Sequence, residues 1–216
     1  MRSYKETVEA LNEMIPEIHE NAVAHGWWEN DREISEIYVL IHSELSEALE
    51  EYRSGKPDVY CAAHGSDWCP ICYGDTCAVS PDTDCLTCFA QRAESGKVPN
   101  KAEGVITELA DAVIRIMDYL GKYGKEIKRL EYSEIEGDKD NFTDMLAGVH
   151  TCLSLAYYQA VTRNSLSVQG EPVNIAVVVR LIWEYTNFKG YDLAEIVRVK
   201  HEYNKTRPYK HGGKRI

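Results

Sequence analysis

Three features are missing from this sequence, and each absence excludes a class of protein. No apolar run approaches the roughly 20 residues that a membrane-spanning helix needs, so no membrane segment is expected. The opening Met-Arg-Ser-Tyr-Lys-Glu-Thr lacks the apolar stretch of a signal peptide, which makes the cytoplasm the default location. Positive charge is also in deficit, because the formal net charge is -11 over 216 residues. That balance argues against general nucleic-acid binding.

Cysteine, in contrast, is plentiful. In a reducing compartment the seven cysteines are better explained as metal ligands or free thiols than as disulfides. Four thiolates in two C-x-x-C pairs suit tetrahedral Zn²⁺ and predict a structural zinc site that folds a segment too small for a core. The predicted zinc ligands are Cys69, Cys72, Cys85 and Cys88. The spare candidates are Cys61, His64 and Cys77.

Apolar residues recur at helical spacing through most of the chain, but not over residues 55–100, where Gly, Pro, Asp and Cys dominate. We therefore expect an all-α helix bundle formed by residues 1–54 and 101–216, with residues 55–100 as a Cys-rich zinc-binding insertion. Helices are predicted over 4–25, from a capping box at 30–33 to about 53, from a capping box at 100–103 to 121 or 124, from 141 to about 162, around 175–183, and from 192 to about 204.

Two positions leave the secondary structure open. Pro16 could kink or split the first helix, because proline lacks a backbone N–H. Residues 175–183 are rich in β-branched side chains and could form a strand by propensity alone. A helix is preferred there because no partner strands are evident.

Carboxylates on two of these helices are the main candidate for chemistry. Glu44 and Glu47 are three residues apart, as are Glu108 and Asp111, so each pair points to one side of its helix. A single pair of this kind is usually a solvated face, but both pairs border apolar stripes that should face the core. Four such carboxylates could bind Mg²⁺ through oxygen ligands. Glu47, with Glu44 beside it, is the candidate catalytic residue, because a carboxylate there could position a water as general base.

The C-terminal stretch is basic inside an acidic protein. Arg207 could bind phosphate in bidentate fashion, and Lys200 and Lys205 could supply point charges. The alternative is a disordered basic tail, although Asn204 and the neighbouring tyrosines and glycines favour a specific loop. Near the N-terminus, Trp28 and its neighbour Trp27 either fill the core between helices or offer a stacking surface to a nucleobase.

These motifs resemble a known family. Glu44-x-x-Glu47 followed by Glu108-x-x-Asp111 is similar to the paired E-x-x-E and E-x-x-D motifs of MazG-like nucleotide pyrophosphohydrolases, in the all-α NTP pyrophosphatase superfamily. The segments 18–28 and 200–212 also look like the opening and the tail of such proteins, and the resemblance covers 1–53, 101–122 and 191–213. It implies Mg²⁺-dependent cleavage of a nucleoside triphosphate to monophosphate and pyrophosphate. The resemblance also implies that this chain has four metal ligands (Glu44, Glu47, Glu108, Asp111) and four phosphate contacts (Lys200, Asn204, Lys205, Arg207).

Two alternatives to this function remain open at this stage. One is an all-α dUTPase or another house-cleaning enzyme with a strong base preference. The other is a non-catalytic regulatory module, in which the bundle is a scaffold and the zinc knuckles recognise a protein or nucleic acid. The carboxylate set argues against the second, since a scaffold has no reason to keep these acids near its core.

An internal echo bears on the oligomeric state. Residues 42–48 align with residues 150–156, and residues 112–116 resemble residues 176–181 with one residue added. In this alignment the carboxylates are absent from the second copy, where the counterparts of Glu44, Glu47, Glu108 and Asp111 are Cys152, Leu155 and, roughly, Val173 and Ala176. Residues 142–188 could thus be a degenerate second repeat that makes the chain a pseudo-dimer. Chance similarity between amphipathic helices, with a homodimer instead, is the other interpretation.

Overall fold

The computed structural model describes residues 1–61, 101–130, 140–162 and 170–210. Their elements are α1 (Tyr4–Ala24), α2 (Ile34–Ser54), β1 (Tyr60–Cys61), β2 (Ala102–Glu103), α4 (Val105–Lys122), α5 (Phe142–Thr162), α6 (Gly170–Phe188) and α7 (Leu193–Lys205). The all-α prediction is confirmed for this part of the chain, including a helix rather than a strand around residues 175–183. None of its helices combines the length and the apolar content needed to cross a bilayer.

Most helix ends follow from local side-chain chemistry. Ser3 forms a capping box with Glu6 at the start of α1, and the helix continues through Pro16 without dividing. Asn141 begins α5 as predicted, because its side-chain oxygen accepts the Asp144 N–H at 3.1 Å. α2 ends at Gly55, which adopts the left-handed conformation with φ 65° that glycine tolerates best.

Both predicted capping boxes in the first half of the bundle were wrong. α2 begins after Glu33, whose side chain makes no cap hydrogen bond. α4 begins after Gly104, because Glu103 pairs with Tyr60 in a short antiparallel ribbon, β1–β2. Residues 102 and 103, predicted to form part of the helix cap, are paired in this ribbon instead. The ribbon closes the described base of the predicted insertion and fixes where α4 starts.

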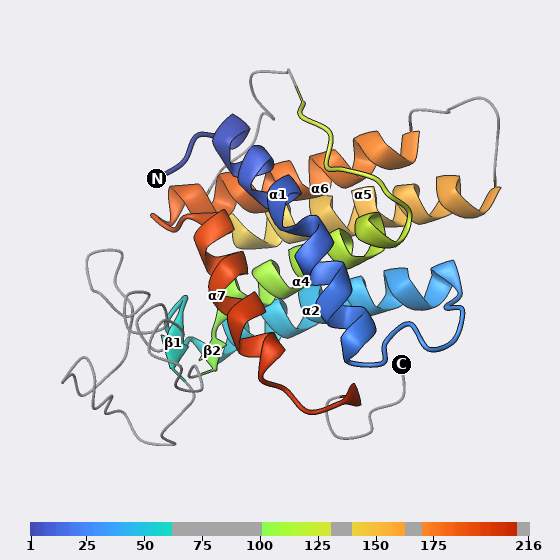
Figure 1. The fold of residues 1–216 in the computed structure, drawn as a ribbon. Coiled ribbons are helices and arrows are strands. Elements are labelled where there is room, and N and C mark those ends of the chain that lie inside the picture. Colours follow the sequence, from blue (N-terminus) through green and yellow to red (C-terminus); the bar gives the residue numbers. More distant parts are fainter. Residues whose placement is uncertain (62–100, 131–139, 163–169, 211–216) are drawn as a thin grey trace.

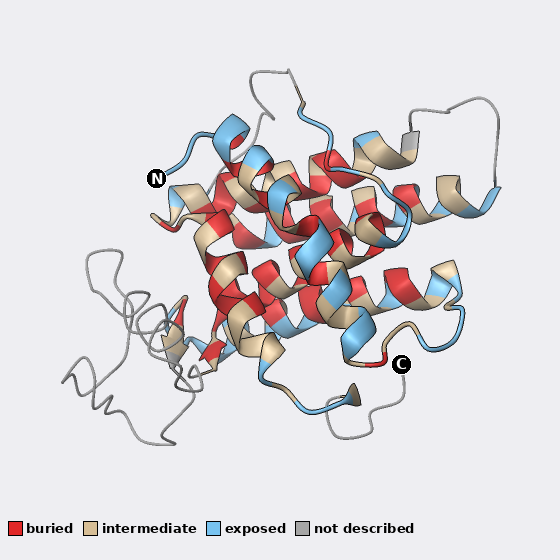
Figure 2. Cartoon of the chain, in the orientation of Figure 1, coloured by how far each residue is buried: buried red, intermediate tan, exposed pale blue. Residues whose placement is uncertain are grey.

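α4 is the central helix of the bundle. It packs against α1, α2 and α7, and more lightly against α6, while α5 and α6 pack mainly against each other (Figure 1). Buried residues line the inner sides of all these helices (Figure 2). Because α4 is surrounded, burial extends even to polar positions in its first turn, Thr107 and Glu108. The helix that carries two of the predicted ligands is therefore the one least exposed to solvent.

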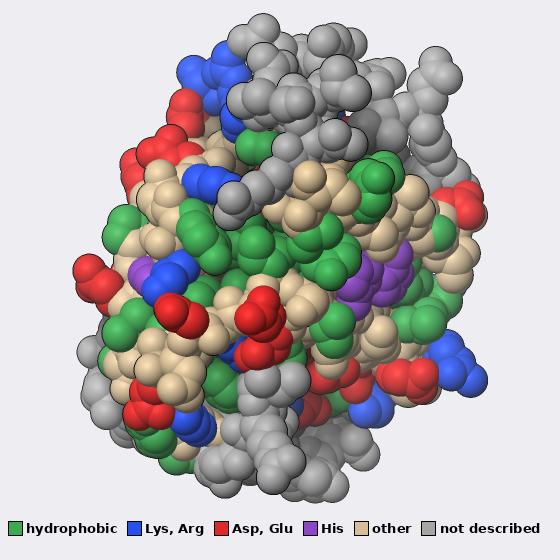
Figure 3. Space-filling model, turned by 90° about the vertical axis from the view of Figure 1, so that its right-hand side faces the viewer, with side chains coloured by type: hydrophobic (Ala, Val, Ile, Leu, Met, Phe, Trp, Pro, Cys, Tyr) green, Lys and Arg blue, Asp and Glu red, His purple; other side chains and the backbone are tan. Residues whose placement is uncertain are grey.

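The helices α2 and α5 repeat the same burial pattern. Their bounds are 34–54 and 142–162, so each position of α5 follows its counterpart in α2 by 108 residues. Buried apolar residues coincide in this register, for example Leu45 with Leu153. His42 and His150, also counterparts, meet with their Nδ1 atoms 2.7 Å apart. In Figure 3 histidine side chains adjoin one another on a part of the surface dominated by hydrophobic and uncharged side chains.

α4 and α6 also match, in a register that differs from the sequence alignment. Positions 66 residues apart share burial and helix termination: Tyr119 corresponds to Tyr185, and both helices are followed by a glycine with positive φ, 59° at Gly124 and 85° at Gly190. The closing hydrogen bonds also correspond, Lys125 N–H to Leu120 O and Tyr191 N–H to Thr186 O, each at 2.9 Å. In this register Glu108 and Asp111 correspond in sequence position to Asn174 and Val177, rather than to Val173 and Ala176. Duplication of a helix pair stays a prediction, and the shared register is its structural support.

Candidate functional site

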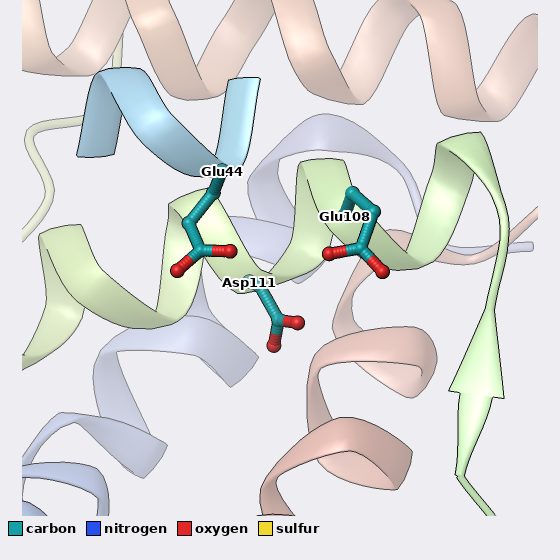
Figure 4. Close-up of side chains that lie close together, drawn as sticks. All are labelled: Glu44, Glu108 and Asp111. Carbon is teal, nitrogen blue, oxygen red and sulfur yellow. The ribbon is translucent and has the colours of Figure 1, made fainter. Parts of the chain in front are cut away.

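Three of the four predicted carboxylates converge. Oxygen atoms of Glu44 on α2 and of Glu108 and Asp111 on α4 all lie within 4.8 Å of one another (Figure 4). Glu44 and Glu108 are each only 7% exposed. The carboxylates from the two helices come together because α2 packs along α4.

Glu47 stands apart from these three. It is exposed on α2 and is not a member of the converging set, although it lines the same cavity. Its negative charge is close enough to add to the causes that raise the pKa of Glu44 and of Glu108. The geometry therefore separates three carboxylates suited to direct ligation from a fourth that is exposed at the cavity wall.

Burial makes it costly to keep the carboxylates of this cluster ionised. Desolvation is the main cause that raises the pKa of Glu108 to about 7, and the charges of Asp111 and Glu44 add to it while Lys200 opposes it. Desolvation likewise raises the pKa of Glu44, against the attraction of Arg115. A divalent cation with oxygen ligands would relieve this cost and hold the carboxylates ionised. The donor set therefore fits a hard cation such as Mg²⁺.

Lys200 on α7 was predicted to contact phosphate, and the structure places it against the carboxylates. Its side chain is 2% exposed, with Nζ 2.6 Å from Asp111 Oδ2 and 3.8 Å from Glu108 Oε1. Nζ also donates to the Ala102 carbonyl at 3.2 Å. Burial alone would lower the pKa of Lys200, but the charges of Asp111 and Glu108 raise it overall, so the side chain is a fixed cation.

Arg115 is a site residue that sequence reasoning missed. Its Nε donates to Glu44, which joins α4 to α2 at the carboxylate cluster. The signal was present in the sequence, because Arg115 follows Asp111 by four residues and so lies on the same side of α4. Opposite charges at that spacing on a ligand-bearing helix could have indicated it.

The cluster forms one wall of a cavity of about 270 Å³. Of the other predicted phosphate contacts, Asn204 and Arg207 line this cavity, whereas Lys205 does not. Lys205 instead forms ion pairs with Glu17 and Glu202. The carboxylates on α2 and α4 thus line the same cavity as Asn204, near the end of α7, and Arg207, which follows that helix.

Trp28, predicted to contact substrate, is fixed by a hydrogen bond to Asp118 and does not line the cavity. Its Nε1 donates to Asp118 Oδ1 at 2.8 Å, and the same oxygen pairs with His19 Nδ1 at 2.7 Å. Burial raises the pKa of Asp118, while the hydrogen bonds from His19 and Trp28 oppose that effect. The neighbouring Trp27 lines the cavity and Trp28 is not among its lining residues, so Trp27 is the tryptophan positioned to meet a ligand.

The predicted zinc ligands Cys69, Cys72, Cys85 and Cys88 lie outside the described residues, as do His64 and Cys77. Cys61 is in β1, at the edge of that segment. Comparison of the chain with protein-family models, with curated proteins and with solved structures found no match in any of the three.

Proposed function

We propose that this protein is a Mg²⁺-dependent nucleoside triphosphate pyrophosphohydrolase with a bundle of the MazG-like, all-α NTP pyrophosphatase type. One observation carries the proposal: a buried carboxylate cluster and the cationic side chain of Arg207 line the same cavity. A nucleoside triphosphate with its metal ion needs both, since the ion requires oxygen ligands and the phosphates require donors. A solvated acidic face would need neither the cavity nor the basic side.

Glu44, Glu108 and Asp111 are the proposed Mg²⁺ ligands. Mg²⁺ prefers octahedral oxygen coordination and keeps several waters, so three carboxylates leave positions for phosphate oxygens. When bound, it would neutralise phosphate charge and polarise the phosphorus to be attacked. The proposed Zn²⁺ has a separate, structural part in residues 55–100.

The chain's own residues then have distinct tasks. Glu47, exposed at the cavity wall, accepts a proton from the attacking water. The water oxygen bonds to the α-phosphorus while the bridge to the β-phosphorus breaks, which yields the monophosphate and pyrophosphate. Arg207 and Asn204, which line the same cavity, donate to the phosphate oxygens. Arg115 and Lys200 keep the ligand carboxylates ionised and oriented.

Pyrophosphate release from a panel of ribo- and deoxyribonucleoside triphosphates tests this function. Wild-type protein with Mg²⁺ should release pyrophosphate and the monophosphate, while EDTA and Glu44→Gln should abolish release. Glu50→Gln is the matched control, because Glu50 is an exposed carboxylate on the same helix outside the cavity lining. Folded wild-type protein that releases no pyrophosphate from any nucleotide would overturn the proposal. Turnover of dUTP alone would identify the dUTPase alternative.

A further inference from the structure

One N–H donor of Arg32 has no acceptor among the described residues. Its side chain is 8% exposed, and its Nε donates to Glu36 Oε1 at 2.7 Å. The Nη2 atom is buried and makes no hydrogen bond to any described residue. A buried guanidinium N–H without an acceptor is costly, since hydrogen bonds to charged groups are among the strongest in proteins. Such an atom in a binding cavity indicates a missing ligand acceptor.

Arg32 lies in that cavity, with aromatic and apolar neighbours. It lines the space together with Trp27, Leu40 and Ile114. Its guanidinium carbon lies 5.6 Å from the ring centroid of Trp27, within the range of a cation–π contact. The polar donor is therefore fixed beside flat and apolar surface, which is the usual composition of a site that binds a planar ring.

The ligand acceptor at Nη2 is better explained as neutral than as phosphate. The charge of Arg32 is already balanced by Glu36 at 2.7 Å, and the half-buried Asp118 interacts with it as well. Phosphate oxygens have a more suitable partner in Arg207, which lines the cavity and for which no ion pair is found among the described residues. A single charge-balanced N–H beside Trp27 suits a carbonyl oxygen on a stacked base.

We propose that Arg32 is a specificity-determining residue whose Nη2 donates to a carbonyl oxygen of the substrate's nucleobase. This inference rests on the proposed function and names its substrate class: nucleotides of guanine, hypoxanthine, cytosine, uracil or thymine, but not adenine, which has no carbonyl oxygen. A base that presents an amino group in place of the carbonyl oxygen leaves Nη2 buried and unpaired, so the site rejects it. One hydrogen bond to a charged donor should give roughly ten- to hundredfold discrimination in kcat/KM.

The decisive experiment compares nucleotides that differ mainly at the relevant position. Inosine and adenosine triphosphates have the same ring size, with a carbonyl oxygen in one and an amino group at the same carbon in the other. Together with GTP, CTP and UTP, they are assayed by pyrophosphate release with Mg²⁺ on wild type, Arg32→Met and Arg32→Lys. At least one carbonyl-bearing base should exceed ATP by tenfold or more in wild type. Arg32→Met should remove that advantage and leave kcat/KM for ATP within about threefold.

Glu36→Gln is the matched control, because it keeps Nη2 in place and should keep the preference. Equal use of ATP by the wild type, a preference that survives Arg32→Met, or a uniform loss on all bases would each overturn the inference. If wild type hydrolyses no nucleotide, the proposed function fails separately. Binding of guanosine, uridine and adenosine monophosphates, measured by calorimetry, then decides the inference: no wild-type preference over adenosine, or one unaffected by Arg32→Met, overturns it.

Discussion

The Lys200 ammonium lies 2.6 Å from Asp111 Oδ2 inside the core and ties α7 to α4. Replacing Lys200 with Met would leave the buried Glu108 and the half-buried Asp111 without their cation. We expect Lys200→Met to lower the free energy of unfolding by about 3–5 kcal/mol, as for other broken buried pairs. Lys205→Met removes a more exposed pair and should cost about 1 kcal/mol or less. Urea denaturation of both variants measures the difference, and equal losses would contradict this account.

Mg²⁺ should partly restore the stability of Lys200→Met. An ion bound at the carboxylates supplies the missing positive charge, and it binds the folded state more tightly than the unfolded one. The increase in melting temperature on adding Mg²⁺ should therefore be larger for Lys200→Met than for wild type. Glu44→Gln in the same background should abolish the increase. A response equal to that of wild type would indicate that Lys200 does not compensate the metal ligands.

Glu47 is expected to act on the rate rather than on metal binding. Because it is exposed and lies outside the converging set, Glu47→Gln should leave Mg²⁺ affinity near that of wild type. Loss of a general base should lower kcat by about 10²-fold or more. The measurement is kcat for pyrophosphate release at saturating Mg²⁺, with Mg²⁺ affinity determined in parallel. A variant that recovers full kcat at high Mg²⁺ would make Glu47 a ligand instead.

The two acidic pairs could be predicted from the sequence because each depends only on helical spacing. Their partner Lys200 could not be, because it reaches Asp111 and Glu108 from α7, which is remote in the chain. A basic residue near the C-terminus was expected to meet phosphate, since the sequence cannot show that α7 packs on α4. Trp28 was predicted to contact substrate, whereas Trp27 is the one that lines the cavity, because the turn that orients the two side chains lies between helices.

The start of α4 shows the same limit of local reasoning. Gly104 has φ 111°, and its carbonyl accepts the Glu108 N–H at 3.1 Å. A Cβ at this position would lie 2.5 Å from the Asp58 carbonyl oxygen. We expect Gly104→Ala to lower the free energy of unfolding by well over 1 kcal/mol, because alanine is strained at this φ and its Cβ clashes with the Asp58 carbonyl.

Gly55→Ala is the control for Gly104. Gly55 also has positive φ, 65°, but nothing lies within 4 Å of its Cβ position. Gly55→Ala should lower the free energy of unfolding only through the strained backbone conformation, by about 1 kcal/mol. Because Gly104 anchors the turn that carries Glu108, Gly104→Ala should also weaken Mg²⁺ binding, whereas Gly55→Ala should not. Equal effects on stability would show that the ribbon shifts to accept the side chain.

The zinc prediction concerns residues outside the described part of the chain and depends on the cysteine spacing alone. Purified protein should contain zinc, measurable by mass spectrometry of the metal. Cys69→Ser and Cys88→Ser should each reduce the zinc content strongly, because a tetrahedral site needs all four ligands. Cys152→Ser is the control, since this thiol lies on α5 and is not in either C-x-x-C pair. Unchanged zinc content in the first two variants would refute the assigned ligand set.

The His42–His150 contact predicts how stability depends on pH. The rings are nearly coplanar, with an interplanar angle of 2° and Nδ1 atoms 2.7 Å apart, so one ring donates and the other accepts. Desolvation lowers the pKa of both, and for His42 the charge of His150 adds to it. Because the folded state binds protons less readily than the unfolded state, this pair stabilises the fold above pH 6.5, and that contribution is lost as pH falls below 6.5.

The test is a double-mutant cycle in which unfolding is followed between pH 5 and 8. Wild type should lose stability toward acid more steeply than the His42→Leu, His150→Leu double variant, since the other titrating groups are common to both. Each single variant should lose about as much as the double variant at pH 8, because the hydrogen bond needs both rings. Additive effects with unchanged pH slopes would mean that the two histidines do not act as a pair. A coupled pair would mean that α2 and α5 are held together by equivalent residues, as expected at the axis between two related halves.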